Sequence, residues 1–491
     1  MSGRKGRLAV KTTRAPFTSG TVLALRVRRI WPGVLFWGAF GCVIVSCGVR
    51  DYVPARFPTF VEARPEEPAA AELPTPDVVA PEAAAPIHVT LAQALEECLA
   101  ADPRIAAGGE LVHQAQSDLW TASLLPNPTL GTGGSLLPLD RAFTVTRQGG
   151  PPQFDVGIAF PVDWLLFGKR AAAITSARSG VDVAAAEYAD LVRQRLAATV
   201  AAFYDVLEAE ALLALAREDL ESFERLQHIT EELVHLGGAG TIEVDRVRVL
   251  VLDSQRDVRQ RTAAVAVAKA ALLGQFGRNT SAAEVDVDGQ LDVAAPATPL
   301  AAERAFRIAE QYRPDVVAAG LRVAKAEADQ RAERSKAFPD VAPRAGYTRQ
   351  FQEKAIGFPD ANSYGVGVDL SVPLFDRNQG NIDKASSVVE QARHEQRARI
   401  VELRTEVEQA TRDFQFAAEA VSGELPARLQ AARNARDKIE TAYRAGGRPL
   451  IDVLDAQRTL RDTQRLAVQD RAAYWRSLYK VNATVGKEVL R

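Results

Sequence analysis

The chain has 491 residues, which is enough for a large core or several domains, and its formal net charge of −2 gives no reason to expect a nucleic acid partner. Three cysteines (Cys42, Cys47 and Cys98) predict no disulfide framework. The five histidines lack the spacing of metal ligands and no motif carries catalytic chemistry. We therefore expect no enzyme activity, no cofactor and no metal site.

The first 46 residues have the pattern of a targeting segment. Three arginines between Arg26 and Arg29 precede an apolar run of about 12 residues from Val34 to Val45, too short to span a bilayer as a helix. The run ends in Ile44-Val45-Ser46-Cys47, which resembles a bacterial lipobox. This predicts a lipoprotein signal peptide over 1–46 and a lipidated Cys47. The alternative is an ordinary signal peptide that is cut elsewhere, with Cys47 inert.

Residues 47–87 are predicted to form a lipidated, proline- and alanine-rich linker. Eight prolines between 51 and 86 exclude a helix and a core, so this segment should be an extended tether. After Cys47 the sequence has no run of 18 apolar residues. A chain of this kind that crosses a membrane must use strands closed into a barrel.

The rest of the chain is predicted to be an internal two-fold repeat, with a first copy over 88–290 and a second over 291–491. Landmarks recur after 209 to 213 residues. They are Asp102-Pro103 with Arg313-Pro314, Leu125-Pro126 with Phe338-Pro339, Val156-Gly157 with Val366-Gly367, Gly237-Gly238 with Gly446-Gly447, and Gly277 with Gly486.

Each half is predicted to run helix, two strands, very long helix, turn, helix. First helices are expected over 91–123 and 302–335, and strands over 129–136, 154–162, 344–351 and 363–372. The stretch 171–236 lacks proline and would make a helix of about 100 Å. Its counterpart, 381–445, is interrupted at Gly423 and Pro426, where we expect a kink.

The helices after the turns carry apolar residues at nearly coiled-coil spacing. One stripe is interrupted by Lys269, whereas the other has Leu478 at the same place. An ordinary amphipathic helix in a core is the alternative interpretation. The stripes are Val258, Thr262, Val265, Leu272 and Phe276 in the first half, and Tyr474, Leu478, Val481 and Val485 in the second.

Four strands per chain cannot close a barrel, and open sheet edges are not tolerated in lipid. Three chains would supply twelve strands, enough for one barrel. We therefore predict a mainly α protein with a transmembrane β-barrel. The fold would be a homotrimer whose long antiparallel coiled-coil helices form an α-barrel below twelve strands.

Several motifs resemble those of the TolC-type outer-membrane efflux family. They are Leu124-Leu125-Pro126-Asn127-Pro128, the run from Tyr443 to Arg448, and the run from Ile451 to Gln457. The run from Val372 to Gly380 is similar to the branch that serves heavy-metal exporters of the cobalt–zinc–cadmium type.

The resemblance implies a passive outer-membrane exit duct of a tripartite efflux system that extends into the periplasm, and the lipobox predicts that this duct is anchored by lipid. Its partners would be a periplasmic adaptor (membrane fusion) protein and an inner-membrane pump of the resistance-nodulation-division (RND) class. The cargo could include heavy-metal cations. A periplasmic adaptor and a structural coiled-coil lipoprotein are the alternatives. An adaptor should have one helical hairpin and no duplication, and a coiled coil leaves the strand pairs unexplained.

The resemblance also implies a periplasmic gate and two docking turns. Tyr443 and Arg448 match family positions that hold the entrance shut. Asp452 and Asp455 lie three residues apart, so they share a helix face and could line a pore in a trimer. The alternative is that both aspartates only favour the positive end of a helix. The adaptor-docking turns would be Leu236-Gly237-Gly238 and Ala445-Gly446-Gly447, although glycine also suits any tight turn.

Overall fold

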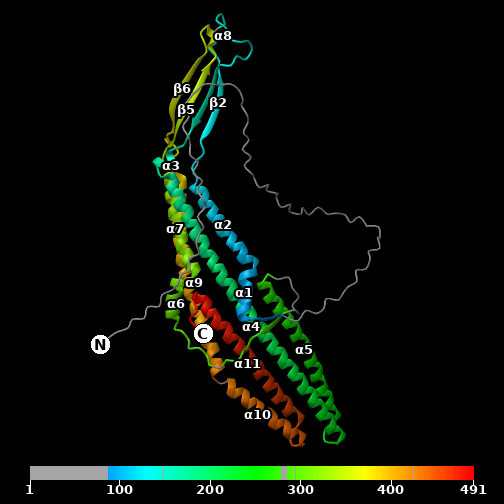
Figure 1. Cartoon of the computed structure of the whole chain (residues 1–491). Coiled ribbons are helices and arrows are strands. Elements are labelled where there is room, and N and C mark those ends of the chain that lie inside the picture. The colour runs from blue at the N-terminus through cyan, green and yellow to red at the C-terminus, as the bar shows by residue number, and fades with distance from the viewer. Residues whose placement is uncertain (1–86, 148, 278–284, 294, 424, 491) are drawn as a thin grey trace, which may run out of the picture. The chain divides into compact units, whose positions relative to one another are not determined.

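The computed structural model describes residues 87–147, 149–277, 285–293, 295–423 and 425–490. The chain divides into two units, Met1–Val78 and Val79–Arg491, and all described residues belong to the second. The predicted signal peptide, Cys47 and the linker up to residue 86 lie outside the described residues. The second unit is mainly helical with few strands, as the sequence predicts (Figure 1).

Each half begins with two short helices where the sequence predicted one. The first pair is α1 (Leu91–Ala101) and α2 (Pro103–Ser123), and the second is α6 (Ala302–Tyr312) and α7 (Pro314–Ser335). The prediction of continuous helices was wrong because Asp102 and Arg313 each precede a proline, which disfavours helical backbone; their ψ angles are 115° and 122°. We call these two bends the first and second elbow.

Long helical hairpins follow in both halves. The first pairs α4 (Lys169–His235) with α5 (Thr241–Gln275). The second joins α9 (Gln379–Ser422) and α10 (Leu425–Arg444) to α11 (Leu450–Val485). The predicted interruption is confirmed, because α9 ends before Gly423, where ψ is −118°, and Pro426 occupies the first turn of α10.

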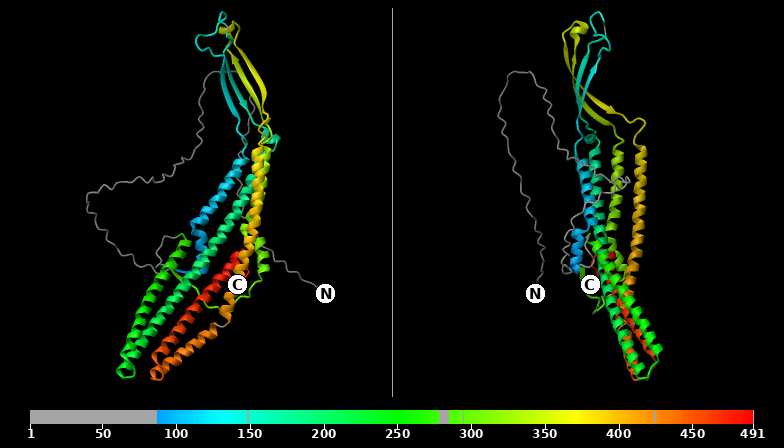
Figure 2. Two further views of the ribbon diagram at one scale, coloured as in Figure 1. Left: turned by 180° about the vertical axis from the view of Figure 1, so that it is seen from behind. Right: turned by 90° about the vertical axis from the view of Figure 1, so that its right-hand side faces the viewer.

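Four of the strands form an antiparallel sheet in the order β2 (Thr129–Ser135), β3 (Gln153–Ala159), β5 (Asp340–Gln350) and β6 (Ala361–Ser371). Strands β2 and β6 are its edges. Short helices α3 (Asp163–Leu166) and α8 (Gln352–Ile356) flank the strands. In Figures 1 and 2 the sheet lies at one end of the second unit and the hairpin turns lie at the other.

The two faces of the sheet differ in polarity. On β6, Tyr364, Val366, Val368 and Leu370 alternate with polar or small residues, which is the alternation expected when one face meets an apolar phase. The face with the small residues carries a row of four glycines that lie opposite one another across all four strands: Gly131, Gly157, Gly346 and Gly365.

Two hydrophobic cores, one in each half, lie where the helices of the elbows pack against the long helices. Phe203 is buried in the first core and Phe414 in the second, and Trp475 and Tyr479 pack against both. The end of the second predicted stripe is buried as expected, at Tyr474, Leu478, Val481 and Val485. In the first stripe Leu272 and Phe276 are buried.

The interruption of the first stripe at Lys269 has a structural reason. Its ammonium lies 2.8 Å from Glu210 on α4 and 3.3 Å from Asp286. Asp286 belongs to β4 (Val285–Asp288), which pairs in parallel with β1 (Ile87–Thr90), a small sheet that the sequence did not reveal. Lys269 therefore ties α5 both to its hairpin partner and to the segment between the halves.

Candidate functional site

The turns of the two hairpins lie at one end of the second unit (Figure 2). The predicted gate and docking residues belong to these turns and to the helix ends beside them. Gly237 and Gly446 adopt left-handed backbone, with φ of 75° and 73°, which closes each turn where a side chain would be strained. Leu236 is 83% exposed at the first turn. A hollow of about 430 Å³ lies beside it and is lined by residues of both hairpins: Arg225, His228, Ile229, Glu232, Leu233, Leu236 and Arg444.

Tyr443 connects the second hairpin to the first. Its side chain is 4% exposed, and its hydroxyl donates to Glu243 Oε2 at 3.4 Å and lies 3.2 Å from Thr230 Oγ1. Thr230 is on α4 and Glu243 on α5, so one hydroxyl contacts both helices of the other hairpin. Burial raises the pKa of Tyr443, and Glu243 raises it further although Thr230 opposes, so the phenol stays a neutral donor.

Apolar packing surrounds this polar contact. The ring of Tyr443 shares a buried cluster with Phe223, Leu226, Val247, Val251, Leu450 and Val453, which come from both hairpins. Burying this apolar surface favours the arrangement in which the hairpin ends are in contact. Glu243 lies 209 residues before Asp452, within the range of the repeat offsets, but the sequence did not reveal that it accepts from Tyr443.

Arg448, Asp452 and Asp455 share one hollow of about 450 Å³, which is also lined by Ile439 on α10. Arg448 Nη1 lies 3.3 Å from Asp452 Oδ2, one turn along the start of α11, and Asp455 is exposed. The predicted shared face of the two aspartates is therefore present. The ion pair described for Arg448 is within its own hairpin, whereas Tyr443 contacts the other hairpin.

A second group of charges between the hairpins was not predicted from the sequence. Asp219 on α4 is half-buried, and its Oδ2 has no hydrogen-bond partner among the described residues. Burial raises its pKa from 3.8 to about 6, although Arg461 and Arg465 on α11 oppose the shift. Arg465 is itself held by Asp257 on α5 at 2.5 Å. Nothing in the local sequence distinguishes Asp219 from a solvated helix residue.

The described residues contain neither a metal-binding cluster nor a helix that could span a membrane. Within the ranges that the structure describes, no three His, Cys, Asp or Glu side chains gather closely enough to hold a metal ion. In those same ranges, none of the helices combines the length and apolar character that crossing a membrane requires.

Comparison with known proteins gives consistent matches. The sequence model of the family described as outer membrane efflux protein matches the chain twice, over residues 94–278 and 306–487. The chain is 26% identical to the cobalt-zinc-cadmium resistance protein CzcC of Cupriavidus metallidurans, covering 77% of this chain and 85% of that protein. It is 25% identical to the pyoverdine export outer membrane protein OpmQ of Pseudomonas aeruginosa, covering 80% and 82%. Crystal structures of CusC share the fold, with a TM-score of 0.68 at 19% identity over 81% of this chain and 92% of CusC.

Proposed function

The chain belongs to the outer membrane efflux protein family and is an outer-membrane channel component of an efflux system, and we propose that its cargo is a heavy-metal cation. A periplasmic adaptor and an inner-membrane pump of the RND class would deliver this cargo. The observation that carries the duct function is the contact of Tyr443 with Thr230 and Glu243, because it joins the two hairpins beside their turns, where a closable entrance is needed.

The proposal for the cargo rests on the 26% identity to a cobalt-zinc-cadmium resistance protein along most of both chains. Deleting the gene for this chain from its host should lower the tolerance of the cells to cobalt, zinc and cadmium, and a plasmid copy of the gene should restore that tolerance. The control is tolerance to an organic toxicant such as toluene, which we expect to be unchanged. Loss of tolerance to the toxicant alone would overturn the metal cargo but leave the duct function standing.

We propose that the channel is a homotrimer in which four strands per chain close a twelve-stranded barrel. The sheet supports this proposal because β2 and β6 each leave an edge that closure would pair. The helices also support it. Helix α7 packs against both α4 and α9, whereas α2 packs mainly against α4. If the halves are an internal repeat, the free flank of α2 should pack against α9 of a second copy, and so around a ring.

The membrane anchor and the adaptor contact remain proposals from the sequence. Lipid on Cys47 would hold the start of the mature chain at the membrane, and the mass of the mature N-terminus tests this directly. The turns Leu236-Gly237-Gly238 and Ala445-Gly446-Gly447 would receive the adaptor, with the hollow between the hairpins beside them.

We propose that Asp452 and Asp455 line the pore and that Arg448 helps to keep it closed. Six carboxylates around a three-fold axis would repel one another and bind a polyvalent cation. Such a cation should block conductance in planar bilayers from the periplasmic side. Replacing both aspartates by alanine should abolish the block and leave the oligomer intact. If the double variant is blocked as strongly as the parent, the aspartates do not face the pore.

A further inference from the structure

Each elbow is held on a long helix by an ion pair whose elbow residue is buried. In the first elbow Asp102 is 3% exposed, and its Oδ2 lies 2.5 Å from Arg195 Nε on α4. Its other oxygen accepts from the backbone N–H of Arg104 and caps α2. One buried carboxylate therefore both starts α2 and fixes it to α4.

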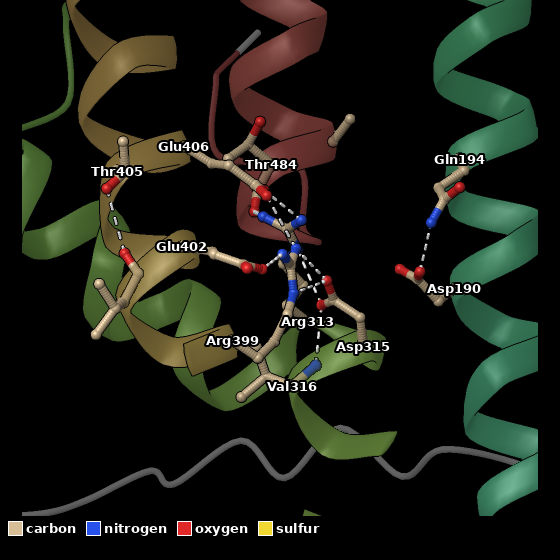
Figure 3. A network of polar contacts seen from close by, with 12 residues as sticks. Asp190, Gln194, Arg313, Asp315, Val316, Arg399, Glu402, Thr405, Glu406 and Thr484 are labelled. Atoms are coloured by element: carbon tan, nitrogen blue, oxygen red, sulfur yellow. Dashed lines mark hydrogen bonds and ion pairs between the residues drawn. The ribbon is translucent and has the colours of Figure 1, made fainter. Parts of the chain in front are cut away.

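In the second elbow the charges are exchanged: the elbow carries the cation and the long helix carries the carboxylate. Arg313 is also 3% exposed, and its Nη2 lies 2.5 Å from Glu406 Oε2 on α9 (Figure 3). Its Nε lies 2.9 Å from Asp315 Oδ1, and its Nη1 donates to the carbonyl of Thr484 at the end of α11. Arg399 contacts both Asp315 and Glu406. Burial would raise the pKa of Asp315, but Arg313 and Arg399 outweigh it and hold that pKa below its ordinary value.

These two ion pairs occupy matching positions in the two halves. Asp102 and Arg313 are 211 residues apart, and so are Arg195 and Glu406. The neighbouring core residue Phe203 matches Phe414 at the same separation, so the long helices are in register here. The polarity of the pair is inverted between the halves.

Shape does not distinguish the elbows from each other. Both have proline after the bend, and both receive a left-handed glycine from the end of the returning helix. A Cβ on Gly277 would lie 2.8 Å from the carbonyl oxygen of Ala101, and a Cβ on Gly486 would lie 3.1 Å from Cα of Arg313. The surface on which each elbow docks, which we call its seat, therefore has a similar form in the two halves.

We propose that the inverted ion pairs direct each elbow onto the long helix of its own half during folding. If the first elbow docked on α9, Asp102 would face Glu406, and the second elbow on α4 would place Arg313 against Arg195. Like charges at a buried site repel because the interior screens them weakly, and this repulsion is strongest at Arg195, whose side chain is 11% exposed. It is weaker at Glu406, which is partly exposed and also contacts Arg399. The correct docking pairs both sets of charges, so the inversion makes two similar seats selective.

Two double variants remove the selectivity while keeping each native pair attractive. Asp102→Arg with Arg195→Glu gives both elbows a cation and both long helices an acid, and Arg313→Asp with Glu406→Arg gives the opposite. The full chain is refolded from denaturant into detergent, and the protease-resistant fraction is measured. We expect each double variant to refold with a yield lower by about threefold or more, because either seat now accepts either elbow.

The variant with all four substitutions restores the inversion with its polarity exchanged, so its yield should return close to that of the parent. It also carries every local cost of the two double variants. A yield at or below the worse double variant would show that the losses are local and overturn the proposal. Parental yields from both double variants would overturn it as well.

Discussion

At the scale of single residues, Tyr443 holds the hairpin ends together with one hydroxyl and one ring. Tyr443→Phe keeps the ring in its apolar cluster but removes the contacts to Glu243 and Thr230. A lost buried hydrogen bond costs about 1–2 kcal/mol, so the resting conductance of the channel in planar bilayers should rise roughly tenfold.

Tyr474→Phe is the matched control for this prediction. It removes another half-buried hydrogen bond, from Ala297 N to the Tyr474 hydroxyl, far from the turns along the same hairpin. Its resting conductance should equal that of the parent. Equal increases in both variants would mean that the conductance reports general loosening and not the contact between hairpins.

Asp219 should make stability depend on pH. Its folded pKa of about 6 lies above the ordinary 3.8, so the protonated form fits the folded chain better. Protonated Asp219 contributes fully to the stability of the folded chain below about pH 4, and this contribution is lost as the pH rises through 6. Asp219→Asn should therefore raise the free energy of unfolding at pH 8 by about 1–2 kcal/mol, after allowing for solvent near the group, and change little at pH 4. Thermal unfolding at both values measures this, and a destabilised variant at pH 8 would show that the pairing with Arg461 and Arg465 dominates.

The site residues that could be predicted from the sequence are those recognisable from their immediate neighbours. Gly237 and Gly446 follow the ends of helices, and Asp452 and Asp455 are spaced for one helix face, so both features follow from local rules. The partners of Tyr443 and the burial of Asp219 depend on which helices meet across 200 or more residues of chain. That information is tertiary, and one sequence does not contain it in readable form.

At the scale of elements, the long helices and the strands could be predicted because they have strong periods and clear glycine and proline boundaries. The break after Ser422 was predicted for the same reason. The elbows were missed although Pro103 and Pro314 were recognised, because a proline at the first helical position starts a helix as readily as it bends one. The β1–β4 pair has only four residues in each strand, too few for a recognisable pattern.

The proposed packing of α2 against α9 of a second copy can be tested by cross-linking. Within the chain Ser176 on α4 hydrogen-bonds to Asp329 on α7. A shift of 211 residues converts this pair into Ser387 on α9 and Asp118 on α2, both exposed in the single chain. Ser387→Cys with Asp118→Cys should cross-link between chains and give dimers and trimers on denaturing gels.

The neighbouring Ser386 provides the control for the cross-link. Ser386 accepts from Gln330 of α7 within its own chain, so Ser386→Cys with Asp118→Cys should give little product between chains. Equal cross-linking from both positions would mean random collision. No cross-link from Ser387 would contradict the proposed ring.

At the scale of the whole molecule, the outer membrane efflux fold was predictable because the motifs recur in matching order in both halves, and the family model also matches twice. The differences between the halves were harder to predict. The second hairpin is broken at Gly423 and carries the aspartates, whereas the first is continuous and supplies Glu243 and Thr230. The broken hairpin therefore has a joint at which it can bend, and the continuous one offers a firm surface for Tyr443.

The glycine row across the sheet has a consequence for what the duct can pass. Gly157 and Gly346 lie two residues from Asp155 and Thr348, which hydrogen-bond on the same face. If the sheet closes with this polar face inward, as the proposed barrel requires, the glycine row forms a ring around the bore at which only backbone lines the passage. Glycine adds no side chain to the bore at this row, and it allows a strand to bend there. A large solute that has passed the hairpin ends would meet no sieve at this level, and one tryptophan in place of Gly346 would install a constriction repeated in every subunit.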